Sequence, residues 1–186
     1  MRLRLYLALI ALFASPASAH PDPVSHVHSF ADGMLHPLTG ADHVIVMASV
    51  GLWGAMVGGR AIWAWPVAFM GLMLTGFAAA CLGLQISFAE SVISVSIVVL
   101  VLLAVLPVRA PLALGVAIVG LFAFFHGYVH ATEAVAASII PYAAGFTLST
   151  AGLHGAGIAL GLWLRHLADR TIGRMGGATG YDGALP

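Results

Sequence analysis

The stretch FHGYVHATE, residues 125–133, carries side chains that could do chemistry. His126 and His130 are four residues apart, which places both imidazoles on one face of a helix, one turn apart. Glu133 follows three residues later on roughly the same face. Two imidazoles at this spacing can bind one divalent metal ion, as they do on zinc-binding helices. The motif therefore predicts a metal site to which Glu133 adds a carboxylate.

A second polar motif, HPLTGADH, lies earlier in the chain, at residues 36–43. It supplies His36, His43 and Asp42, and the carboxylate could either bind a metal directly or orient an imidazole. The proline and threonine of the motif are typical of a helix start. We therefore expect a helix to begin inside the motif, with Thr39 or Asp42 near its N-terminal end.

Imidazole and carboxylate ligands suit borderline divalent metals, namely nickel, copper, zinc, cobalt and iron, and the single cysteine speaks against a soft-ion site. Two more histidines are candidates. His154 stands alone inside the last apolar stretch, either as a hydrogen-bonded structural residue or as part of a metal pathway. His20 could chelate a metal through its α-amine and imidazole if a signal peptide is cleaved before it. The alternative for His20 is a polar tail with incidental histidines.

The elements that carry these residues are predicted to be membrane helices. The chain is 61% hydrophobic and 8% charged, whereas soluble domains carry roughly 25% charged residues. Apolar stretches of this length must be helical, because lipid cannot satisfy an open backbone. The fold class expected is an all-α integral membrane protein with about five transmembrane helices. The predicted spans are 40–58, 61–82, 88–106, 111–131 and 139–164.

The N-terminal segment has the pattern of a secretory signal peptide, with two arginines, a short apolar core and small residues at 17–19. The alternative is an uncleaved first membrane helix. The arginines of the mature chain all fall where five spans would put cytoplasmic loops or the tail, so we expect the N-terminus outside and the C-terminus in the cytoplasm. The predicted segments are a signal peptide (1–19), a periplasmic histidine-containing lead (20–39), a five-helix domain (40–164) and a cytoplasmic tail (165–186). A multi-pass protein of the bacterial inner membrane is expected.

This topology relates the two motifs to each other. The first span runs inward and the fourth runs outward, so both motifs lie at the outer end of the helices. We therefore predict that they form one metal site and not two. The alternative is that Asp42 merely caps its helix and that His43 is hydrogen-bonded to it.

The paired motifs resemble those of the HupE/UreJ family of bacterial membrane proteins, and the resemblance extends from the signal peptide to the end of the fourth span. It implies a role in nickel supply to hydrogenase and urease, as a permease or accessory protein. One departure is Ala131, which stands where the family usually has glycine and leaves every candidate ligand in place. The resemblance implies functional roles for His36, Asp42, His43, His126, His130 and Glu133.

The leading functional prediction is a metal permease and not an enzyme. Its substrate would be Ni²⁺, with Zn²⁺, Cu²⁺ or Co²⁺ as alternatives, and the ion would pass inward near His154. The sequence has no GxxxxGK[ST] motif, so a gradient, the membrane potential or a partner would drive movement. The alternatives are an intramembrane metal-dependent hydrolase and a metal-binding accessory or sensor protein that does not transport. The expected partners are the lipid bilayer, the metal ion and further copies of the chain, but not nucleic acid.

Overall fold

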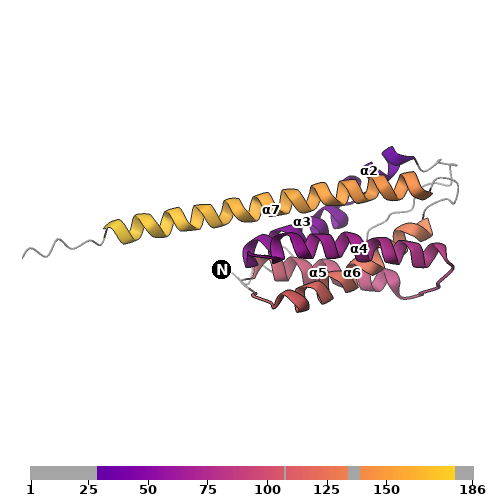
Figure 1. Cartoon of the computed structure of the whole chain (residues 1–186), viewed down its shortest axis with the longest axis horizontal. Helices are drawn as coiled ribbons and strands as arrows, with labels where there is room; N and C mark the ends of the chain where they lie inside the picture. Colours follow the sequence, from indigo (N-terminus) through magenta and orange to yellow (C-terminus); the bar gives the residue numbers. More distant parts are fainter. Residues whose placement is uncertain (1–28, 107, 134–138, 179–186) are drawn as a thin grey trace, which may run out of the picture.

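The computed structural model describes residues 29–106, 108–133 and 139–178, so the predicted signal peptide and His20 lie outside it. Over the described residues the chain is all helical, without strands (Figure 1). The five predicted spans correspond to the helices α3 to α7, and α7 continues well beyond residue 164. The helices are α2 (Phe30–Thr39), α3 (Ala41–Val57), α4 (Ala61–Cys81), α5 (Ala89–Val105), α6 (Leu112–Glu133) and α7 (Ile139–Ala178).

Helix α2 was not predicted, although a local signal for it exists. The Ser29 side chain accepts a hydrogen bond from the Asp32 backbone N–H, and the Asp32 carboxylate accepts one from the Ser29 backbone N–H. This reciprocal capping box starts α2. The helix ends at Thr39, and α3 begins at Ala41 with Asp42 in its first turn, after a bend of 83°. A helix therefore does begin inside the first motif, but it is preceded by a second helix that carries His36.

The helix ends gather at two opposite ends of the bundle. His43, in the first turn of α3, contacts His130, in the last turn of α6. At the opposite end, the Trp53 indole donates to the carbonyl of Val108, just before α6. Helices α3 and α6 are therefore antiparallel, as the predicted topology requires. We call the end that holds His43 and His130 the histidine end.

The other end, which we call the arginine end, collects Arg60, Arg109 and Arg165. Arg60 lies in the turn between α3 and α4, and Arg109 lies between α5 and α6. The Arg165 guanidinium of α7 donates to the carbonyl of Ala55, near the end of α3 (2.9 Å). The three arginines thus share one end, which agrees with the predicted topology. Their cytoplasmic location stays a prediction.

Close helix approach depends on selected glycines. A Cβ on Gly51 would collide with the backbone of His154, and one on Gly157 with the backbone of Ala48, so α3 and α7 pack backbone to backbone. Gly152 and Gly155 face open space instead. Small residues therefore allow close packing on the face of α7 that touches α3, but not on its open face.

The described helices support a membrane protein, with fewer crossings than were predicted. By length and composition, α4 and α6 can each cross a membrane, and α2 with α3 could count as one broken crossing. Helix α5 is apolar but has 17 residues. In Figure 1 the C-terminal half of α7 extends away from the other helices. Five crossings therefore stay a prediction.

Candidate metal centre

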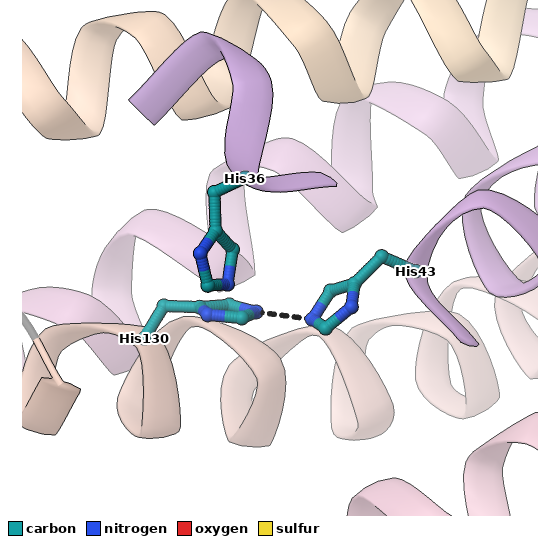
Figure 2. A group of neighbouring side chains, drawn as sticks. All are labelled: His36, His43 and His130. Carbon is teal, nitrogen blue, oxygen red and sulfur yellow. Dashed lines mark hydrogen bonds between the residues drawn. The ribbon is translucent and has the colours of Figure 1, made fainter. Parts of the chain in front are cut away.

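Three imidazoles from three different helices converge at the histidine end (Figure 2). His36 comes from α2, His43 from α3 and His130 from α6. One ring nitrogen of each lies within 4.8 Å of the others. His43 Nε2 and His130 Nε2 lie 2.7 Å apart. Ligand nitrogens around a tetrahedral zinc-like ion lie about 3.3 Å apart, for metal–nitrogen bonds of about 2.0 Å. A small outward movement of these rings would therefore admit an ion.

The Asp42 carboxylate fixes the orientation of His43. Its Oδ1 lies 2.9 Å from His43 Nδ1. A carboxylate accepts, so Nδ1 carries the proton and Nε2 presents its lone pair toward His130. This is the arrangement in which a carboxylate orients a metal-binding imidazole from behind. The structure thus favours an orienting role for Asp42 over direct ligation.

Helix α7 covers one side of the three-imidazole cluster with aromatic side chains, which we call the aromatic wall. The Phe146 ring lies 4.5 Å from the His130 ring and 6.1 Å from the His36 ring, measured between centroids. Tyr142, one turn earlier, also lies 6.1 Å from His36. His130 is buried, whereas His36 and His43 are partly exposed. An ion could therefore reach the cluster past His36 and His43, with the aromatic wall on the opposite side.

His126 lies one turn deeper than His130 and is not part of the three-imidazole group. Its Nδ1 donates to the carbonyl of Phe122 (2.9 Å), which leaves Nε2 as the ring nitrogen with a lone pair. The His126 and His43 rings lie 6.0 Å apart. His130 turns to His36 and His43, so joint metal binding by His126 and His130 stays a prediction.

The remaining candidates lie elsewhere. His154 is buried deeper in α7, and its Nδ1 donates to the carbonyl of Met47 (2.6 Å). Glu133 is the last residue of α6, at the histidine end, but its side chain lies outside the described structure. Phe146 and Tyr142 were missed, because aromatic residues in an apolar helix carry no sequence signal that separates a site wall from ordinary core.

Comparisons with known proteins agree with the resemblance. The sequence profile described as HupE / UreJ protein matches residues 7–185. The chain belongs to the HupE/UreJ family. The curated protein named Protein HupE, from Rhizobium leguminosarum bv. viciae, is 34% identical over 177 residues, which cover 94% of this chain and 93% of that protein. No solved structure matches the chain.

In this HupE/UreJ protein the departure at Ala131 has a packing explanation. Ala131 is 8% exposed and belongs to a small apolar cluster with Phe77 and Tyr142. Its methyl group adds apolar contact directly after His130, on the side where α4 and α7 meet α6. Ala131 therefore packs against Phe77 and Tyr142 and leaves every candidate ligand in place.

Proposed function

We propose that this protein is a membrane permease for a divalent transition metal cation, with Ni²⁺ as the leading ion. The observation that carries the proposal is the convergence of His36, His43 and His130 from three helices, with a carboxylate behind His43. Such a group of imidazoles binds borderline metals through neutral ring nitrogens. In the first step, the hydrated cation exchanges water molecules for the imidazole nitrogens of this cluster.

Three points support transport of a cation. The cluster lies at one end of the bundle, where His36 and His43 are partly exposed and accessible to an arriving ion. The HupE/UreJ family is associated with nickel supply to hydrogenase and urease, and the chain is a member. Asp42 contributes a negative charge that compensates part of the charge of the ion.

The test combines binding and flux on the full chain without an affinity tag. Ni²⁺ binding is titrated in lipid nanodiscs, and Ni²⁺ entry is followed in sealed proteoliposomes that hold only this protein and an internal metal-sensitive dye. His130→Ala should weaken tight binding by tenfold or more, about 1.4 kcal/mol, and abolish entry. His166→Ala is the matched control, because His166 is an exposed imidazole near the arginine end of α7.

Each alternative gives a different result. Tight binding without entry would identify an accessory or sensor protein. Metal-dependent turnover of a lipid or ester would favour the hydrolase. Unchanged Ni²⁺ affinity in a folded His130→Ala protein would contradict the proposed site.

A further inference from the structure

Helix α7 also carries buried polar atoms without a hydrogen-bond partner among the described residues. Thr150 and His154 are at most 1% exposed. Thr150 Oγ1 and His154 Nε2 have no hydrogen-bond partner among the described residues. The two residues are four apart, so their side chains lie on one face of the helix. Ser149 Oγ is also buried and unpartnered, but Ser149 projects from a different face.

Thr150 differs from most helical hydroxyls of this chain. A helical serine or threonine usually donates to a backbone carbonyl one turn earlier, which satisfies it inside an apolar environment. Thr147, on the same helix, does this with the carbonyl of Ala143 (2.7 Å). Six other hydroxyls make the same kind of bond: Thr39, Thr75, Ser94, Ser96, Thr132 and Thr171. The Thr150 hydroxyl is not used in this way, so its oxygen stays available to a ligand.

The His154 ring is held in one tautomer. The Met47 carbonyl can only accept, so Nδ1 carries the proton and Nε2 carries the lone pair. This is the same tautomer that Asp42 imposes on His43. An imidazole fixed by its Nδ1–H with a bare Nε2 is the usual state of a metal-binding histidine.

The depth of this pair follows from the helices that surround it. Met47 is one turn beyond His43 on α3, which is about 6 Å farther from the histidine end. The Phe69 ring of α4 packs beside both deeper histidines. Its centroid lies 4.9 Å from that of the His154 ring and 5.9 Å from that of the His126 ring. The pair of Thr150 and His154 is therefore a separate position, one layer below the three-imidazole cluster.

We propose that His154 Nε2 and Thr150 Oγ1 form a second, weaker binding position for a divalent transition metal cation, on the route from the histidine end to the arginine end. This inference rests on the proposed permease function. One imidazole and one hydroxyl supply fewer and weaker ligand atoms than three imidazoles, so the ion binds less tightly here. Conduction requires successive sites that are weak enough to release the ion.

The experiment uses the full chain, with Ni²⁺ as the probe in nanodiscs and proteoliposomes. Thr150→Val removes the hydroxyl while keeping the side-chain volume, and His154→Ala removes the imidazole. Thr147→Val is the matched control, because its hydroxyl already has a backbone partner. Thr150→Ser restores the oxygen and should recover the native behaviour. The predicted lead histidines are present in every variant, so they contribute equally to every titration.

The expected result has two parts. Saturating Ni²⁺ should occupy one weak equivalent fewer in Thr150→Val and His154→Ala, while tight binding changes less than about twofold, and Ni²⁺ entry should fall about tenfold. Unchanged stoichiometry in folded Thr150→Val protein would overturn the site, and unchanged entry would overturn its place on the route. Failure of the proposed function would look different: the native protein would bind Ni²⁺ without entry, or folded His130→Ala protein would keep its tight binding. The number of weak equivalents in Thr150→Val and His154→Ala tests the second position in either case.

Discussion

At the scale of single residues, the orientation of the His43 ring determines which of its nitrogens faces the rest of the candidate metal centre. The hydrogen bond between Asp42 and His43 turns the Nε2 lone pair of His43 toward His130. An imidazole binds a metal ion more tightly when a neighbouring group already holds the ring in the orientation that binding requires. We therefore expect Asp42 to act through His43, and this effect can be separated experimentally from that of a direct ligand.

We predict that Asp42→Asn lowers Ni²⁺ affinity by about tenfold to a hundredfold, as expected for loss of an orienting carboxylate. The asparagine oxygen can still accept from His43, so stoichiometry should be preserved. Calorimetric titration measures both quantities. Asp169→Asn, which alters an exposed carboxylate of α7, should leave the titration unchanged. Loss of all binding in folded Asp42→Asn protein would make Asp42 a direct ligand instead.

A double-mutant cycle tests whether the two motifs act as one site. His43→Ala and His130→Ala together should lose much less binding free energy than the sum of the single losses, with a coupling of at least about 1 kcal/mol. The reason is that either substitution already dismantles the cluster. His43→Ala with His126→Ala should show weaker coupling, because His126 lies outside the group. Strictly additive losses for His43 and His130 would support separate roles.

At the scale of elements, the break between α2 and α3 brings His36 next to His43. Gly40 lies at the bend of 83°, with φ −91° and ψ 115°. These angles suit any residue, so backbone strain does not require glycine here. Space does require it, since an added Cβ would lie 2.6 Å from His43 Nδ1 and 2.8 Å from Asp42 Oδ1.

We therefore predict that Gly40→Ala weakens Ni²⁺ binding by about tenfold while the unfolding temperature changes little. The methyl group would push apart two movable side-chain ends and leave the backbone in place. Binding and thermal unfolding in the same detergent provide the measurement. A large drop in the unfolding temperature would show that Gly40 supports the fold and not the site.

Gly127 lies where α6 packs against α4, and here we expect a substitution to lower the stability of the protein. A Cβ at this position would collide with the backbone of Met73. Because backbone cannot move aside as a side chain does, Gly127→Ala should destabilise the protein by about 1–3 kcal/mol. Gly71→Ala on α4 is the control, since a Cβ there meets nothing within 4 Å. Equal stability of the two variants would contradict the close helix contact.

At the scale of the whole molecule, the two ends differ in chemistry. One end gathers histidines with Asp42, and the other gathers Arg60, Arg109 and Arg165. In a membrane, arginine-rich ends stay on the cytoplasmic side. The same orientation would expose the three-imidazole cluster to metal outside the cell.

We predict that reporter fusions after Gly59 and after Arg174 both give a cytoplasmic signal. Both positions belong to the arginine end or to the part of α7 beyond it. A fusion after Gly83, in the turn between α4 and α5, should report the periplasm. A periplasmic signal from either of the first two fusions would reverse or break the predicted topology.

The sequence by itself determined most of the helices and the chemical types of the candidate ligands. Long apolar stretches must be helical in lipid, and the predicted limits of the first four spans lie close to those of α3, α4, α5 and α6. Opposite directions of the first and fourth spans were enough to predict that both motifs share one end. The contact between His43 and His130 agrees with that argument.

Only the tertiary structure decided which ring nitrogens meet. His126 and His130 looked equivalent by spacing, but His126 is tied to the carbonyl of Phe122 while His130 turns to His36 and His43. Helix α2, its packing on α7 and the wall made by Phe146 create that difference. These helices are apolar on nearly every face, so periodicity does not reveal how each is rotated about its axis. That rotation is set by contacts between elements far apart in the chain, and it decides which side chains converge.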